Sequence, residues 1–192
     1  VVFNAGKRPA DASVFENAIK EAKEVFQIAK DLGIELKCLD IGDGFPAETG
    51  SDGSKMQEIV KRVNETLEKH FGDVEDLRVI AEPGRFFVEN SHLLLFNVIG
   101  KKKVENQGET TFLYYMNEGI YGCFNHIRFD EAKPDIIPFI ERNEKTYKSV
   151  IFGPTCDSFD TVARDIYLPE LEIGEWCYSE RNGAYTRAST TK

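Results

Sequence analysis

The sequence lacks the features that mark several common classes of protein. It contains no apolar run long enough to cross a membrane, and we expect no signal peptide at its start. Its four cysteines, at positions 38, 123, 156 and 177, have neither metal-ligand nor disulfide-framework spacing, which favours a reducing, cytoplasmic environment. Only 24 basic residues stand against 33 acidic ones, and the net charge of −9 argues against nucleic-acid or anionic membrane partners.

An initiator methionine is also missing. The chain opens on Val1-Val2-Phe3, already inside a hydrophobic run, and we therefore expect an upstream portion to precede it. The basic run Lys101-Lys102-Lys103 follows a strand-like segment and is predicted to be a solvated loop. With 41% apolar residues, the 192-residue chain can build a packed core as one ordinary domain or two small ones.

The first half of the sequence alternates between strand-like and helix-like patterns. Between Ser13 and Lys30, apolar residues recur every three or four positions, as on the buried face of an amphipathic helix. Short links join the segments, which predicts parallel strands whose carboxyl ends carry ligand-binding loops. The expected strands cover residues 1–6, 36–41 and 77–81, and the expected helices begin at Ser13 and Ser54.

The pattern changes after about residue 90. The later segments are strand-like and are separated by glycine- and proline-containing turns, so this half is expected to be mainly β. We place one domain boundary near residue 90. The expected strands of the second half cover residues 92–99, 111–116, 149–152 and 175–178.

The stretch from Leu39 to Pro46, LDIGDGFP, ends a predicted buried strand with a glycine turn. Gly42 and Gly44 permit positive φ angles and close backbone approach, so the N–H groups of the turn can point at an anion such as a phosphate. Asp43 lies between the two glycines and adds a negative charge. The turn is therefore a candidate phosphate site with one unfavourable residue.

Three further short blocks accompany this turn, and each alone is only weakly diagnostic. Gly-Pro pairs usually mark turns, and a Glu beside an Arg is usually a surface pair. Together and in this order, the blocks resemble the eukaryotic ornithine decarboxylase family of pyridoxal-phosphate enzymes, which includes the non-catalytic antizyme inhibitors. The blocks are EPGR at 82–85, GPTCDSFD at 153–160 and NGAYT at 182–186, and the similarity extends through YGCFN at 121–125 and LPELEIGEW at 168–176.

The resemblance implies an α/β plus β fold, in which a TIM-like (β/α)8 barrel precedes a mainly β domain. Residues 1–90 would form the last three β/α steps of a barrel that binds pyridoxal 5′-phosphate, and residues 91–192 an incomplete C-terminal β domain. A complete barrel takes about 250 residues, so the chain would be a fragment. The family's Schiff-base lysine would lie upstream of Val1, and the family acts as a homodimer with shared active sites.

The resemblance also assigns cofactor-binding roles to five residues. Glu82 would face the pyridine nitrogen and hold its proton, and Arg85 would pair with the cofactor phosphate. Tyr185 would donate its hydroxyl to the same phosphate, and Gly42 and Gly44 would supply backbone N–H groups. The three side-chain assignments each have a plainer alternative: a surface carboxylate for Glu82, a local ion pair for Arg85 and a packing role for Tyr185.

Three residues would act on the substrate from across the subunit interface. In the resembled enzymes, the residue matched by Cys156 returns a proton to the substrate carbon after decarboxylation. Asp157 and Asp130 would bracket the distal ammonium group of a basic amino acid such as ornithine, because paired carboxylates favour a second cationic amine. Without the resemblance, Asp130 is expected to be a solvated loop residue.

Four positions depart from the family pattern within the site. Asn4 stands where the family has a histidine stacked on the cofactor ring, and Lys7 replaces a serine that bonds the phosphate. Asp43 replaces the central glycine of the turn, and Phe129 replaces a tyrosine beside the substrate aspartate. We hypothesise that Asp43 and Lys7 pair with each other, so that the carboxylate takes the place of the phosphate and cofactor binding is in doubt.

Two functions from different classes follow. The first is a lyase that converts L-ornithine to putrescine and CO2 in polyamine biosynthesis, and the retained Cys156 favours it. The second is a catalytically inactive, antizyme-inhibitor-like binding protein with antizyme as a possible partner, and the substitution at Asp43 favours it. A lysine, arginine or diaminopimelate decarboxylase of the same fold is a third reading, although CDSFD favours the ornithine branch.

Overall fold

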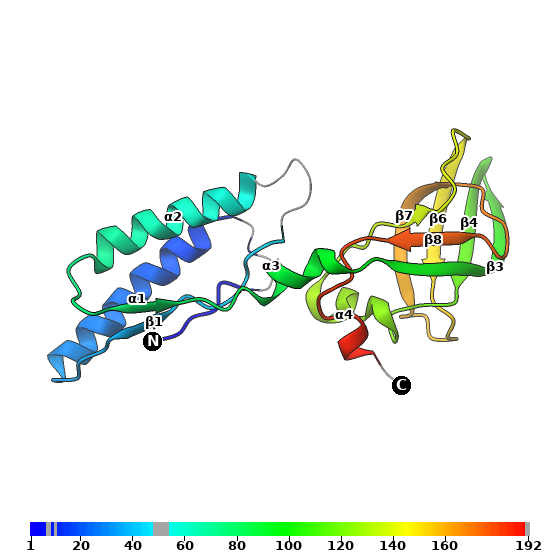
Figure 1. Cartoon of the computed structure of the whole chain (residues 1–192). Coiled ribbons are helices and arrows are strands. Elements are labelled where there is room, and N and C mark those ends of the chain that lie inside the picture. The colour runs from blue at the N-terminus through cyan, green and yellow to red at the C-terminus, as the bar shows by residue number, and fades with distance from the viewer. Residues whose placement is uncertain (7–8, 10, 48–53, 191–192) are drawn as a thin grey trace. The chain divides into compact units, whose positions relative to one another are not determined.

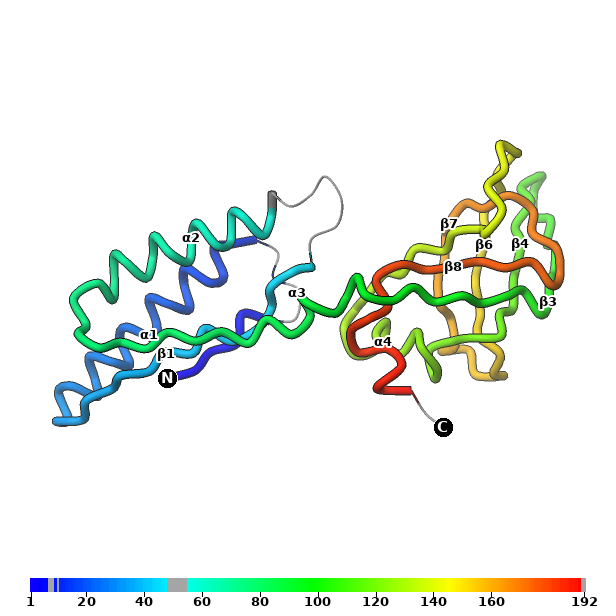
Figure 2. The backbone as a smooth tube through the Cα atoms, viewed as in Figure 1, coloured from blue at the N-terminus to red at the C-terminus, as the bar shows by residue number. Residues whose placement is uncertain are grey.

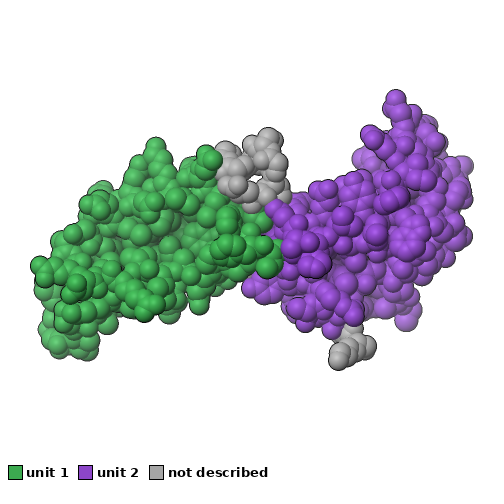
Figure 3. All heavy atoms as spheres, viewed as in Figure 1, with its two compact units in different colours: residues 1–88 green, residues 89–192 purple. Residues whose placement is uncertain are grey.

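The computed structural model describes residues 1–6, 9, 11–47 and 54–190 and divides the chain into two compact units. Unit 1 covers residues 1–88 and unit 2 covers residues 89–192, as the two colours in Figure 3 show. Among the described residues, no helix combines the length and the apolar character needed to span a membrane.

In unit 1, helices and strands alternate in the order α1-β1-α2-β2-α3 (Figure 1). Strands β1 and β2 are parallel, with Leu39 opposite Val79. The expected first strand is reduced to a parallel bridge between Val2 and Asp40. The elements are α1 (Ser13–Asp31), β1 (Cys38–Asp40), α2 (Ser54–Phe71), β2 (Arg78–Ile80) and α3 (Gly84–Val88).

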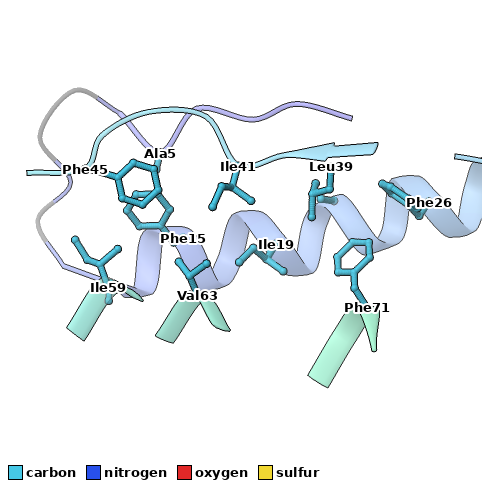
Figure 4. Packing of buried hydrophobic residues seen from close by; sticks show 12 residues of the cluster. Ala5, Phe15, Ile19, Phe26, Leu39, Ile41, Phe45, Ile59, Val63 and Phe71 are labelled. Carbon is cyan, nitrogen blue, oxygen red and sulfur yellow. The ribbon is translucent and has the colours of Figure 1, made fainter. Parts of the chain in front are cut away.

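The core of unit 1 forms where the apolar face of α1 meets β1 and α2. The buried residues of α1 recur at intervals of three and four, which turns one face of the helix inward. The Phe15 ring lies 5.0 Å from that of Phe45, and the Phe26 ring lies 5.1 Å from that of Phe71. In Figure 4 the two aromatic pairs are spaced along α1, and Leu39, which is fully buried at the centre of β1, lies between them.

Unit 2 is built on one mixed six-stranded sheet with the order β5-β8-β3-β4-β6-β7. Strands β4 and β6 are parallel, and all other neighbours are antiparallel. In Figure 2, β3 and β8 run alongside each other, as their pairing requires. The strands are β3 (Leu94–Asn106), β4 (Glu109–Met116), β5 (Ile137–Pro138), β6 (Thr146–Phe152), β7 (Thr161–Pro169) and β8 (Trp176–Ser179).

Short helical turns fill the connections of unit 2. The turn η3 (Cys123–Asn125) leads directly into α4 (His126–Asp130), and η2 (Glu89–Ser91) and η4 (Arg187–Ser189) lie near the two ends of the unit. The core of unit 2 combines aromatic and aliphatic side chains. The rings of Phe96 and Phe124 meet edge to face at 5.2 Å, so the η3 turn is packed onto the sheet.

The basic run at 101–103 is part of β3, which corrects the expectation of a solvated loop. Lys101 donates hydrogen bonds to Glu170 at 2.7 Å and to Glu172 at 2.8 Å, and its ammonium lies 5.3 Å from the centre of the Phe112 ring. Its stem covers apolar surface while its charge is neutralised, so a lysine is accommodated within a strand.

Candidate functional site

The glycine turn after β1 has the tight geometry that its sequence predicts. Gly42 and Gly44 have φ angles of 68° and 94°, which L side chains rarely adopt. A Cβ atom at Gly42 would lie 2.1 Å from the carbonyl oxygen of Phe3, and one at Gly44 would lie 2.5 Å from that of Gly6. Both positions therefore require glycine.

Two hydrogen bonds fix this turn within unit 1. The N–H of Gly42 donates to Oδ1 of Asp40 at 2.9 Å, and the N–H of Glu82 donates to the carbonyl of Gly42 at 2.8 Å. The second bond brings EPGR beside the turn. The first occupies an N–H group that the resemblance assigns to a phosphate, because the Asp40 carboxylate already accepts from it.

Asp43 lies in the turn with one carboxylate oxygen in an unfavourable environment. Its Oδ1 atom is buried and has no hydrogen-bond partner among the residues that the structure describes. A phosphate charge about 4 Å from a carboxylate costs about 4 kcal/mol at an effective dielectric constant near 20. The described residues of the turn therefore do not fit a phosphate dianion.

Asn4 and Lys7 are the two other positions in residues 1–90 that depart from the family pattern within the site. Asn4 uses its Oδ1 atom to accept the N–H of Gly6 at 2.7 Å, so its side chain is engaged in the local loop. Lys7 lies outside the described residues, and so does its expected ion pair with Asp43.

Glu82 and Arg85 follow β2, at the edge of unit 1 that carries the turn. Glu82 is exposed just after the strand, whereas Arg85 is buried in the short helix α3. Because the Glu82 N–H is bonded to Gly42, the structure brings EPGR and the glycine turn together. The roles of both side chains toward a cofactor stay predictions.

The loop between β6 and β7 presents Cys156 and Asp157. The thiol of Cys156 is exposed. The carboxylate of Asp157 accepts a hydrogen bond from the Tyr121 hydroxyl and another, at 2.9 Å, from the N–H of Phe159. The Tyr121 hydrogen bond is the largest of the effects that lower the pKa of Asp157, and the Phe159 N–H adds to it. Asp157 is therefore held as an oriented anion.

Asp160 anchors this loop and is absent from the predicted site residues. It is only 1% exposed. Its Oδ1 accepts the N–H of Ile120 at 2.9 Å, and its Oδ2 accepts both the N–H and the hydroxyl of Thr155 at 3.1 and 2.8 Å. Asp160 therefore joins the loop of Cys156 to the segment of Tyr121. Its sequence signal is its place at the end of GPTCDSFD.

The two glycines around Asp160 explain why the carboxylate fits there. A Cβ atom at Gly153 would lie 2.2 Å from Oδ1 of Asp160, and one at Gly119 would lie 2.3 Å from the same atom. Both glycines thus leave space for the carboxylate. The first of them is the opening residue of the GPTCDSFD block.

Helix α4 places Asp130 and Phe129 side by side in sequence but in different environments. Asp130 is buried, which differs from the loop residue expected without the resemblance, whereas Phe129 is 63% exposed. The guanidinium of Arg128 lies 5.7 Å from the centre of the Phe159 ring. Next to them is a cavity of about 320 Å³, lined by Ile120, Tyr121, Asn125, Arg128, Phe129, Phe159 and Ser189.

Tyr185 lies in a turn that is tied to the η3 segment. It has a φ of 56° and is 55% exposed. Beside it, Thr186 is buried, and its carbonyl accepts the side-chain amide of Asn125 at 2.9 Å. The structure thus joins NGAYT to YGCFN within unit 2.

Comparison with known proteins defines the class of this fold and site. Residues 13–183 match the family described as "Pyridoxal-dependent decarboxylase, C-terminal sheet domain". The chain belongs to this family. The mixed sheet of unit 2 is consistent with that description.

Two relatives of the chain have different names and functions. The chain is 38% identical to antizyme inhibitor 2 of Xenopus laevis and 39% identical to ornithine decarboxylase of Cricetulus griseus, with 100% of the chain and 44% of each relative covered. The chain thus spans less than half the length of these relatives. Its sequence is about equally similar to an enzyme and to a protein named as an inhibitor.

Solved structures show the same relationship in three dimensions. The arginine decarboxylase of Paramecium bursaria Chlorella virus, bound to agmatine, aligns with a TM-score of 0.87 at 33% identity, covering 99% of this chain and 50% of that one. The lysine/ornithine decarboxylase of Vibrio vulnificus, complexed with cadaverine, aligns with a TM-score of 0.82 at 32% identity and the same coverage.

Proposed function

We propose that the full-length protein is an ornithine-decarboxylase-like protein without turnover, which acts in the cytoplasm as an antizyme-inhibitor-like regulatory binding protein. The observation that carries this proposal is the Oδ1 atom of Asp43, which is buried and has no hydrogen-bond partner among the described residues, in the turn that the resemblance assigns to the cofactor phosphate. The similarity to antizyme inhibitor 2 supplies the partner class.

The proposal includes the architecture of the whole protein. Unit 1 would be the last three β/α steps of a (β/α)8 barrel, and unit 2 the C-terminal β domain of a homodimer with shared sites. The parallel pairing of β1 with β2 and the likeness of the whole chain to solved decarboxylases support this architecture.

An active decarboxylase is the second candidate, favoured by the loop that carries Cys156. This function would release CO2 from L-ornithine and form putrescine. The Cys156 thiol is exposed, and the neighbouring Asp157 is held as an anion by the Tyr121 hydroxyl. An anionic pair of Asp157 and Asp130 would suit the distal ammonium of a basic amino acid.

Two measurements on the full-length protein separate the candidates. CO2 release from carboxyl-labelled ornithine, with added pyridoxal phosphate, tests turnover, and binding to purified antizyme tests the regulatory function. We expect antizyme binding without CO2 release. Turnover at the rate of a known ornithine decarboxylase, measured in parallel, would refute the first proposal and establish the second.

A further inference from the structure

The glycine turn of unit 1 has glycine-specific backbone geometry, but an aspartate, Asp43, stands where the resembled family has a third glycine. Gly42 and Gly44 retain positive φ angles, and the space beside each is closed by a backbone carbonyl. Two charged side chains, those of Asp40 and Asp43, lie at the turn, and of the two only Asp43 departs from the family pattern. Of these, Asp40 serves the fold, because its Oδ1 accepts the Gly42 N–H at 2.9 Å.

Among the described residues, none gives the Asp43 side chain a comparable structural role. Its Oδ1 is buried without a partner in the described part of the chain, so the carboxylate gains no compensating hydrogen bond there. A carboxylate with one buried, unsatisfied oxygen repels a second anion more strongly than a fully solvated carboxylate does, because screening by water is weaker there. We infer that Asp43 is the specificity-determining residue that excludes phosphorylated ligands from this turn.

The inference predicts that one substitution reverses the exclusion. Asp43→Gly removes the charge from a turn whose glycines already fit it. Arg85 lies in α3 of the same unit, three residues after Glu82, whose N–H donates to the Gly42 carbonyl, and the resemblance assigns the Arg85 guanidinium to the phosphate. The inference rests on the proposed function only in placing the ligand's phosphate at this turn.

The experiment compares pyridoxine with pyridoxine phosphate by calorimetry on the full-length protein. These probes differ only in the phosphate, and neither has an aldehyde that could react with a lysine. We expect the wild-type protein to bind them equally weakly. Asp43→Gly is expected to bind the phosphate compound about 1000-fold more tightly than the wild-type protein does, with pyridoxine unchanged, which corresponds to ~4 kcal/mol.

A second test variant, Asp43→Asn, and a control variant, Asp76→Gly, show whether the effect is specific to the charge at position 43. Asp43→Asn removes the charge and keeps the size of the side chain, so it is expected to recover part of the gain. Asp76→Gly removes an aspartate of unit 1 that is exposed and has a φ of 54°, and it is expected to change neither affinity. Circular dichroism of each variant confirms that it is folded.

The outcomes are distinct from those of the activity test. A wild-type protein that already prefers the phosphate compound, or two folded Asp43 variants without any gain, would overturn the inference. A variant gain without CO2 release by the wild type supports both the inference and the proposed function. CO2 release by the wild type refutes the proposed function, whichever ratio the two probes give.

Discussion

Replacing Asp160 by alanine tests whether this buried carboxylate organises the loop of Cys156. The substitution removes the acceptor for the N–H groups of Ile120 and Thr155, which lie at 2.9 and 3.1 Å, and for the Thr155 hydroxyl. The site is almost fully buried, so water does not readily replace the lost acceptor. The connection between two segments forty residues apart in sequence would be lost.

The magnitude follows from the number of donors that would be left without a partner. An unsatisfied buried N–H group costs about 1–3 kcal/mol, so two of them cost about 2–6 kcal/mol. The Thr155 hydroxyl can rotate to a new acceptor and adds little. Asp160→Asn keeps one acceptor oxygen and is expected to lose about half as much.

Urea unfolding followed by tryptophan fluorescence measures the effect. The chain has a single tryptophan, Trp176 in β8, so the signal reports on unit 2. Hydrogen exchange at Ile120 and Thr155 localises the change. Asp135→Ala is the control, because Asp135 is half exposed and pairs with Arg181 at 2.7 Å, a contact worth at most about 1 kcal/mol. A loss below about 1 kcal/mol for Asp160→Ala would refute the anchoring role.

Three further predictions concern other parts of the chain. Phe15→Ala, which empties a fully buried position of unit 1, is expected to destabilise that unit by about 3–5 kcal/mol in thermal unfolding followed by circular dichroism. Burial raises the pKa of Cys177 to about 12, so mass spectrometry after alkylation of the native protein should find Cys156 modified and Cys177 unmodified. Tyr121→Phe removes the largest cause of the lowered pKa of Asp157, so that pKa should rise toward its ordinary value in an NMR titration. A lowered pKa of Asp157 in the folded protein gives stability that is lost as pH falls through that pKa, so the variant should gain less stability from ionisation of Asp157. An unchanged titration of Asp157 would contradict the hydrogen bond from Tyr121.

The helices were predictable because their periodicity is local. The stripe that predicts a helix from Ser13 to Lys30 gives α1 within one residue, since every buried position lies on one face. Strand β7 was not predicted. Asp165 has a φ of 55° within it, and the pairing of β7 with β6 shifts register, so the alternation of apolar and polar residues is interrupted. Lys101 was misplaced for a different reason: its carboxylate partners lie about seventy residues away in sequence.

In the candidate site too, some features can be predicted from local sequence and others depend on contacts between distant segments. Asp43 is visible in the sequence as a charge between two glycines. That its Oδ1 atom lacks a partner among the described residues, and that Asp40 accepts the Gly42 N–H, depends on folded geometry. Asp160 has no periodic signal, and its importance comes from donors on two separate segments.

The sequence by itself determined the family, and it predicted a boundary near residue 90 and the positions that depart from the family pattern, because short motifs and local periodicity depend on residues close together in sequence. The tertiary structure decided which of these residues have partners. It joined EPGR to the glycine turn, oriented Asp157 through Tyr121 and left one oxygen of Asp43 unpartnered among the described residues. The physical reason is that burial and hydrogen bonding depend on distances between segments far apart in the chain.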